Sequence, residues 1–419
     1  MRRSCDKRAA HRPTHSGGES ATKLLRATFL GITLDCKLTY RSHIKSLRDK
    51  CFKTLDILKC VARTSYGADR ITLLLLYRSL VRSRLDYGSF IYDNAASSSK
   101  LILDTVHHAA IRIATGAFRT TPVVSLLAEA HEPPLALRRQ MLGMRYAIKL
   151  RQFPYHPAHR PAFSRSFLAH FDGDERNRSR VFCARMADLL RDCGLRSRDI
   201  MRIDTLPEPP WRLPAPTVDV TLSGTRKNEI LPVAFKMKAM EHIEQYSVHT
   251  VAYTDGSKSE SGAGCAFVCG DAVRCFTLPK HASVFTCELV AILKLLCFIE
   301  IKPARSYLVL SDSLSGLQSL TQFYPPDPLV QDILLRLTAL AREGTTVICW
   351  IPSHVGIAGN ERAGRAANDA AQQPCSRRFP LPARDFLPAV SSFFRGKWQE
   401  ASTQCDRNKL LRITPDLAT

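Results

Sequence analysis

The stretch SVHTVAYTDGS, residues 247–257, decides the fold, because there the chain changes from a helical to a strand-forming pattern. It is rich in β-branched and aromatic residues and runs into Asp255-Gly256, a pair typical of turns. A second β-rich run, GAGCAFVCG at 262–270, follows after a short polar segment, and DAVRCFTL at 271–278 comes directly after it. Short runs bounded by glycine and polar residues predict three antiparallel strands.

Beyond residue 278 the pattern alternates between helix and strand. Helices are predicted at 283–301, 313–320, 327–344 and 357–373, and strands at 305–312 and 345–353. Three antiparallel strands followed by such alternation are typical of a mixed sheet with helices on both faces. The predicted fold class is therefore α/β, with a five-stranded mixed sheet flanked by helices and preceded by a mainly helical region.

The rest of the chain divides by composition. Amphipathic helices with Arg and Lys on their outer faces dominate the first part, for example HIKSLRDKCFKTLDILKCVA at 43–62. Proline punctuates the middle, which predicts a linker region with one helix near 179–193. We expect a disordered basic N-terminus at 1–22, a helical region at 23–150, the linker region at 151–247, the α/β domain at 248–373, and a basic tail at 374–419 with a helix at 384–401.

The charge of the protein is strongly unbalanced. Its 419 residues include 60 Lys and Arg against 38 Asp and Glu, a formal net charge of +22. Such an excess attracts polyanions, because Lys and Arg neutralise phosphates in most sequence-independent nucleic-acid binding. A basic protein without such a partner is the alternative. We expect nucleic acid to be the partner.

The cysteines and the apolar runs exclude other classes of protein. The 14 cysteines form no C-x-x-C pair, and Cys265, Cys269 and Cys275 alternate with apolar residues, which favours buried strand thiols over a zinc site. No uncharged apolar run reaches the roughly 18 residues needed to span a bilayer. The basic start of the chain lacks the apolar core of a secretory signal. We expect an intracellular protein, in the nucleus or cytoplasm, without a membrane partner.

Three carboxylates stand in unusually apolar surroundings. Asp255 ends a predicted buried strand, Glu288 lies in the first turns of an apolar helix, and Asp312 follows the strand YLVL. Each alone has an ordinary explanation, as a turn former, a charge near a helix N-terminus or a helix cap. Together they can converge on one edge of the sheet, where a set of oxygen ligands suits Mg²⁺ or Mn²⁺.

Four phrases in this part of the chain resemble, in order and spacing, the four motifs of type 1 ribonuclease H domains. They are YTDGSKSESGAGCAFV (253–268), FTCELVAILKLL (285–296), LSDSLSGLQSL (310–320) and WIPSHVGIAGNERAGRAANDAA (350–371). The resemblance implies an endonuclease that hydrolyses the RNA strand of RNA–DNA hybrids with two divalent ions, Mg²⁺ or Mn²⁺, about 4 Å apart. It also implies that Asp255, Glu288 and Asp312 are catalytic metal ligands. His354 matches the catalytic histidine of a mobile loop.

One position departs from the pattern of that family. The fourth acid should lie four residues after the asparagine of an Asn-Glu pair, but after Asn360-Glu361 this position is Gly364. Asp369 is rotated by about 140° from it on a helix, and Asn368 is neutral and about 6 Å further along. Glu361, about 60° away and one turn back, is the best substitute ligand. We expect a weak second ion and an impaired nuclease, with a nucleic-acid-binding module without turnover as the alternative.

The first part of the chain resembles the segment that follows the palm in reverse transcriptases of non-LTR retrotransposons. The matching phrases are FLGITLDCKLTYRSHI (29–44), YGADRITLLLLYRSLVRSRLDYGSFIYDNA (66–95) and VHHAAIRIATGAFRTTPVVSLLAEAHEPPL (106–135), and WQEASTQCDRNKLLRITPDL (398–417) resembles the tail of such polyproteins. This resemblance implies a thumb or connector region in a fragment of a retrotransposon polyprotein. No Tyr/Phe-x-Asp-Asp palm motif is present, so we expect no polymerase activity. A decayed element without function is a further alternative.

Overall fold

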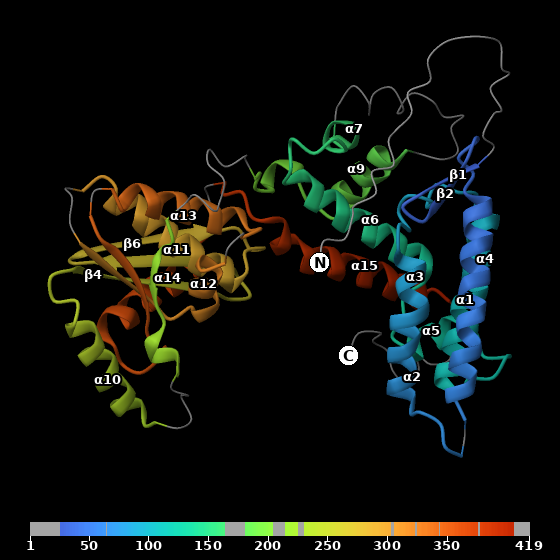
Figure 1. Ribbon diagram of the computed structural model, residues 1–419, viewed down its shortest axis with the longest axis horizontal. Coiled ribbons are helices and arrows are strands. Elements are labelled where there is room, and N and C mark those ends of the chain that lie inside the picture. Colours follow the sequence, from blue (N-terminus) through green and yellow to red (C-terminus); the bar gives the residue numbers. More distant parts are fainter. Residues whose placement is uncertain are drawn as a thin grey trace, which may run out of the picture.

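The computed structural model describes residues 26–63, 65–163, 181–203, 214–224, 230–302, 306–322, 325–342, 344–375 and 378–405. They form a sheet lobe and a helical lobe, joined by one long helix (Figure 1). The N-terminus at 1–22, expected to be disordered, lies outside these ranges. Within them, every helix is too short or too polar to span a bilayer.

A six-stranded mixed sheet, in the order β3-β8-β7-β4-β5-β6, forms the centre of the sheet lobe. The strands are β3 (Thr217–Asp219), β4 (Thr250–Lys258), β5 (Ala263–Cys269), β6 (Ala272–Leu278), β7 (Tyr307–Ser311) and β8 (Thr346–Trp350). β4, β5 and β6 pair antiparallel, whereas β4, β7, β8 and β3 pair parallel in that order. The predicted α/β class with a mixed sheet is confirmed, and the five predicted strands are β4 to β8.

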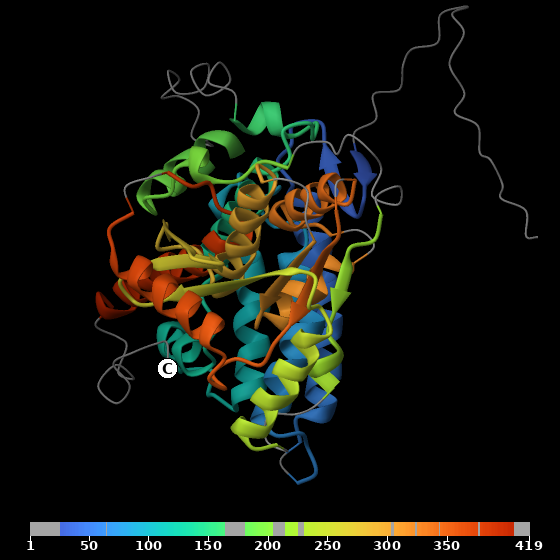
Figure 2. The same ribbon diagram turned by 90° about the vertical axis from the view of Figure 1, so that its left-hand side faces the viewer.

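The additional strand, β3, lies in the segment that the prolines predicted to be a linker. Pro214 and Pro216 precede it closely, and proline is tolerated at the start of an edge strand because it is not needed there as a ladder donor. β3 pairs with β8 as far as Asp219, which lies opposite Cys349. Helix α10 (Pro232–Glu244) follows. The predicted linker region therefore extends the sheet lobe at its β8 edge (Figure 2).

Helices cover both faces of the sheet. α11 (Val284–Ile299) and α14 (Ala358–Gln372) each contact β4 and β5, and α12 (Leu314–Leu320) and α13 (Pro328–Leu340) lie beside α11. A Cβ on Gly256 would collide with the backbone of α11, and one on Gly264 with the backbone of α14. Because Gly256 pairs with Cys265, the residue after Gly264, the two glycines face opposite sides. Their missing side chains let both helices approach the strands that carry the predicted site.

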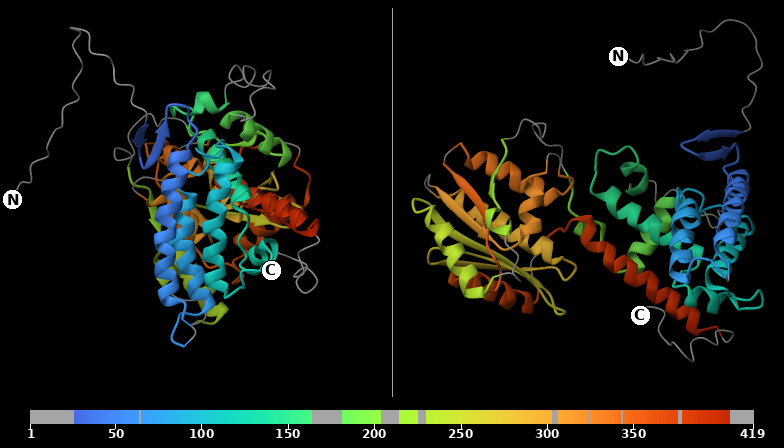
Figure 3. Two further views of the ribbon diagram at one scale, coloured as in Figure 1. Left: turned by 90° about the vertical axis from the view of Figure 1, so that its right-hand side faces the viewer. Right: turned by 60° about the horizontal axis from the view of Figure 1, so that its bottom comes forward.

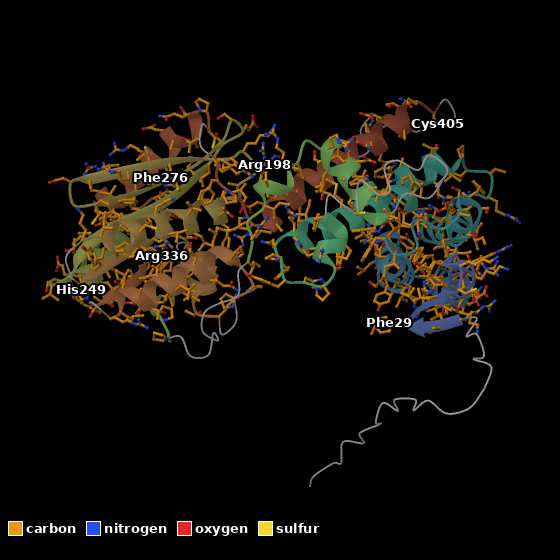
Figure 4. The ribbon with its side chains drawn as sticks, turned by 90° about the horizontal axis from the view of Figure 1, so that it is seen from above. Phe29, Arg198, His249, Phe276, Arg336 and Cys405 are labelled. Carbon is orange, nitrogen blue, oxygen red and sulfur yellow. The ribbon has the colours of Figure 1, made fainter. Side chains whose placement is uncertain are left out.

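The helical lobe begins with a hairpin and continues as packed helices. Its elements are β1 (Arg26–Phe29), β2 (Ile32–Asp35), α1 (Arg41–Val61), α2 (Arg70–Leu76), the π-helical turn η1 (Tyr77–Arg82), α3 (Ser83–Asp86), α4 (Ser97–Thr115), α5 (Val123–Glu129), α6 (Leu135–Arg151), α7 (His159–Phe163) and α9 (Phe182–Asp192). On α1, Ile44, Leu55 and Leu58 are buried, which agrees with the amphipathic helix predicted at 43–62. Figure 4 shows Phe29 of the hairpin and His249 of the sheet lobe at opposite ends of the molecule.

Helix α15 (Ala383–Thr403) connects the two lobes (Figure 3). Phe386 and Phe394 belong to the core that contains the sheet, whereas Trp398 belongs to the core of the helical lobe. α15 packs along α6, whose Leu135 and Met144 are likewise divided between the helical core and the sheet core. The two lobes therefore share two neighbouring helices.

Two buried carboxylates pair with arginines in the helical lobe. Glu132 is fully buried and accepts hydrogen bonds from Arg78 Nε and Arg82 Nη1, both at 2.7 Å. Asp93 accepts one from Arg139 Nε at 3.0 Å and is also paired with Arg185. Burial disfavours a lone charge, so these pairs compensate one another within the lobe.

Candidate active site

Asp255 lies on β4, on the face of the sheet that α14 covers. It pairs across the ladder with Ala266 of β5, and its Oδ2 would be only 2.7 Å from a Cβ placed on Gly364. Burial first, and then the charges of Asp312 and Glu361, raise the pKa of Asp255 to about 7, against a backbone hydrogen bond from Gly256 that lowers it. The carboxylate is thus held where its negative charge is poorly compensated.

Glu288 reaches the same place from α11, on the other face of the sheet. Ser283 caps this helix by accepting a hydrogen bond from the Thr286 backbone N–H at 3.2 Å, which fixes the first turns. Glu288 is buried, and its Oε2 has no hydrogen-bond partner among the described residues. Burial, followed by the charges of Asp255 and Asp312, raises its pKa well above the usual value.

Asp312 follows β7 directly, next to β4 in the parallel part of the sheet. Asn360 of α14 donates from Nδ2 to Asp312 Oδ2 at 3.3 Å. Trp350, at the end of β8, donates from Nε1 to the backbone oxygen of Asp312 at 3.1 Å. Neighbouring elements on both sides thus fix the position of this carboxylate.

The three acids that the sequence singled out converge. One carboxylate oxygen from each of Asp255, Glu288 and Asp312 lies within 4.8 Å of the others. Like charges this close repel one another, which agrees with the raised pKa values of Asp255 and Glu288. A divalent cation fits this arrangement, because it would compensate the charges and give the unpartnered Glu288 Oε2 a partner.

The acids line an open cleft of about 860 Å³ that also contains His354, Glu361 and Gly364. His354 lies on the loop between β8 and α14 with φ 57°. A left-handed conformation costs energy for a residue with a Cβ, and such strain clusters at functional loops. The structure therefore brings His354 and Glu361 to the same cleft as the three acids.

The backbone of α14 lies directly against Asp255 at Gly364. A side chain there would displace the Asp255 carboxylate from its present position, because the Cβ alone would come within 2.7 Å of Oδ2. Of the substitutes weighed from the sequence, Asn368 accepts a hydrogen bond from Ser257 at 3.5 Å and Asp369 is exposed. Glu361 is near enough for its charge to raise the pKa of Asp255.

Sequence reasoning missed three side chains of this cleft. Asn360, used only as a marker of the motif, bonds Asp312 and is buried. Lys258 and Arg365 also line the cleft and bring positive charge to its wall. In the sequence, Lys258 lies three residues after Asp255, and Arg365 lies five residues after Asn360. This spacing is the only signal for the two cations.

Comparison with known families agrees with this geometry. Residues 247–372 match the family model for RNase H, so this part of the chain is an RNase H domain. Membership of this family implies a nucleic-acid substrate. The match includes β4 to β8 and α11 to α14, but not β3 or α10. No curated protein matches the chain.

Proposed function

We propose that the protein is an endoribonuclease that hydrolyses the RNA strand of RNA–DNA hybrids. The convergence of Asp255, Glu288 and Asp312 in an open cleft of an RNase H domain carries this proposal. Such a domain acts on nucleic acid, and a basic protein of net charge +22 attracts the phosphate backbone.

Two divalent cations, Mg²⁺ or Mn²⁺, would supply activation of the attacking water and stabilisation of the leaving 3′-oxygen. Asp255, Glu288 and Asp312 would hold these ions, with Asp255 central because it is close to both other acids and to Glu361. Asn360 orients Asp312 through its amide. His354, which lines the cleft, would exchange a proton at the leaving oxygen or assist product release.

Gly364 is the reason to expect weak activity. The position expected to carry a fourth acid has no side chain, and Glu361 is the remaining carboxylate of α14 in the cleft. We propose that Glu361 serves the second ion from one turn away, so that this ion is held weakly. Mn²⁺ should then support cleavage better than Mg²⁺, which demands stricter octahedral geometry.

The second candidate function is binding of nucleic acid without turnover, and Gly364 is also the observation that favours it. In both cases we propose that Lys258 and Arg365 contact phosphates beside the acids. We also propose that the helical lobe derives from a retrotransposon reverse transcriptase and docks the hybrid inside the cell, which its resemblance to thumb or connector segments supports.

The decisive experiment incubates the full chain with a labelled RNA–DNA hybrid and either Mg²⁺ or Mn²⁺. The nuclease cuts only the RNA strand, faster with Mn²⁺, and leaves 5′-phosphate ends; Asp255→Asn removes the cleavage but not the binding. Hybrid binding without cleavage under either ion establishes the binding module and rejects the nuclease. A salt series checks the docking, since affinity that is insensitive to salt contradicts phosphate binding.

A further inference from the structure

A second group of side chains that could hold a metal ion lies at the β3 edge of the sheet, beside β8. Figure 2 shows β3 and α10 on this side of the sheet. Asp219 of β3 pairs with Cys349 of β8 in the ladder, so both side chains point to the same face. His242 of α10 reaches this face and donates from Nε2 to Asp219 Oδ2 at 2.7 Å. The carboxylate oxygen, the imidazole nitrogen and the sulfur all lie within 4.8 Å of one another.

We propose that Asp219, His242 and Cys349 form a zinc site that fastens α10 to the edge of the sheet. One oxygen, one nitrogen and one sulfur ligand suit Zn²⁺, which accepts all three and often keeps water in its fourth position. Mg²⁺ prefers oxygen alone, so the acid cluster and this cluster should select different ions. The proposal does not depend on the nuclease, because two of the three ligands lie outside the RNase H match.

The geometry needs only a small local change to accept the ion. Two ligands about 2.0–2.1 Å from zinc at a tetrahedral angle lie about 3.3 Å apart, against 2.7 Å between His242 Nε2 and Asp219 Oδ2. The ring proton of His242 would move from Nε2 to Nδ1 through solvent, so that the Nε2 lone pair can bind the ion, and Nε2 and Oδ2 would move apart by about half an ångström. Tyr246 donates to Asp219 Oδ2 at 2.8 Å, and the Thr221 backbone N–H donates to Oδ1 at 2.9 Å. These hydrogen bonds hold the Asp219 carboxylate in one orientation, as the hydrogen-bond partners of metal ligands commonly do.

The cysteine is buried, with 1% of its surface exposed. Burial and then the nearby Asp219 raise the pKa of the Cys349 thiol to about 12. Zinc binding would release the thiol proton to solvent and form the Zn–S bond, as at other cysteine ligands. The ion would then compensate the charges of the carboxylate and the thiolate.

Zinc binding at this site would also stabilise the position of Asp312 in the acid cluster. The residue after Cys349, Trp350, packs its ring against Phe235 of α10 with 6.3 Å between centroids. The same Trp350 donates to the backbone oxygen of Asp312 at 3.1 Å. An ion that fixes α10 on β8 thus fixes the support of Asp312.

Cobalt titration of the full chain in excess Mg²⁺ tests the site, because Co²⁺ substitutes for zinc and absorbs in the near ultraviolet only when a thiolate binds it. We expect a saturable thiolate–cobalt band that added Zn²⁺ displaces. Cys349→Ser should lose it, and Cys269→Ser, a half-buried cysteine on β5, should retain it. A wild-type chain without the band, or a band undiminished in Cys349→Ser, overturns the proposal.

A second variant keeps the test valid should Cys349→Ser unfold. His242→Gln preserves an N–H donor toward Asp219 but removes the imidazole ligand. We expect Zn²⁺ to raise the unfolding midpoint of the wild type in excess Mg²⁺ and to leave that of His242→Gln unchanged. Equal zinc-dependent shifts in both proteins would show that the ion binds elsewhere and reject the assignment.

Discussion

Buried carboxylates in the two lobes have opposite surroundings. In the helical lobe, Glu132 and Asp93 each accept hydrogen bonds from two arginines. In the sheet lobe, Asp255, Glu288 and Asp312 lie within 4.8 Å of one another, and the charge of one raises the pKa of the next. The first arrangement is complete within the chain, whereas in the second a bound cation would compensate the charges.

The difference separates groups that hold the fold together from groups that act on a ligand. Neutralising a carboxylate in an arginine pair leaves partly or fully buried arginines without their charged partner. Neutralising one in the acid cluster relieves repulsion and removes a ligand for the ion. The same chemical change should therefore destabilise one lobe and inactivate the other.

The largest effect is expected at the acid cluster. Asp255→Asn should lower Mn²⁺-supported cleavage by about a thousandfold, because ions supply several kcal/mol to the transition state. Its unfolding midpoint without metal should be no lower than that of the wild type, since a repelling charge is gone. Rates and thermal unfolding should be compared with Asp369→Asn, an exposed acid of α14 that should change neither. A fall in stability with retained cleavage would reverse our reading of the cluster.

The counterpart in the helical lobe is Glu132→Gln. It should lower the free energy of unfolding by about 2–3 kcal/mol, because Arg78 and Arg82, which are only partly buried, lose a fully buried charged partner. Denaturant titration measures this loss. The control is Glu129→Gln, whose pair with Arg70 is half exposed and should contribute less than about 1 kcal/mol. Similar losses in both variants would mean that burial of the pair does not matter here.

Acid should destabilise the helical lobe through a histidine. His107 is fully buried and shares a 2.7 Å hydrogen bond with the Tyr77 hydroxyl; burial, followed by the charge of His108, lowers its pKa to about 3. The folded state keeps His107 neutral while the unfolded chain takes up a proton below pH 6.5, so stability is present above pH 6.5 and is lost as the pH falls. At pH 5 the loss should be about 2 kcal/mol.

The measurement is the free energy of unfolding by denaturant at a series of pH values. His107→Gln should flatten the decline between pH 6.5 and 5 by about the same amount, while its stability at pH 8 falls through the altered contact with Tyr77. Parallel pH curves for the variant and the wild type would show that another group causes the acid sensitivity.

The smallest effect concerns Gly364. Gly364→Asp should raise Mg²⁺-supported cleavage by about tenfold, or ~1.4 kcal/mol, because it adds a ligand for the second ion. The Asp255 carboxylate would shift to make room for the new Cβ. Gly364→Ala adds the same Cβ without the carboxylate and should lower the rate. Metal titration of both variants separates ligand gain from displacement. If alanine and aspartate act alike, the fourth ligand does not belong at this position.

The fold of the sheet lobe could be predicted because each of its main strands has a recognisable local sequence pattern. β4, β5 and β6 are β-rich runs bounded by glycine or polar residues. The sequence predicts Asp255 at the end of its strand, but β4 continues to Lys258, so Asp255 lies within the strand. β3 could not be predicted, because the prolines around it suggest a linker and its pairing partner, β8, lies about 130 residues further along the chain. Pairing over such a distance depends on the whole fold and leaves no local pattern.

The candidate site residues differ in the same way in how local their sequence patterns are. Asp255, Glu288 and Asp312 each occupy a recognisable place on a strand or helix, and His354 a glycine-containing loop. Asp219, His242 and Cys349 come from a short edge strand, a separate helix and a buried strand. Their spacing fits no metal-binding motif, so only the packing of α10 against β8 brings them together.

The shared helix α15 also sets the order in which the protein can be completed during synthesis. The helical lobe emerges first, but Trp398 of its core is made more than 200 residues after Leu135. Contacts between such distant residues form late, since loop closure must precede them. The apolar surface of α6 that α15 covers therefore stays exposed to solvent until the sheet lobe has been synthesised. Folding of the helical lobe is therefore complete only after α15 has been synthesised.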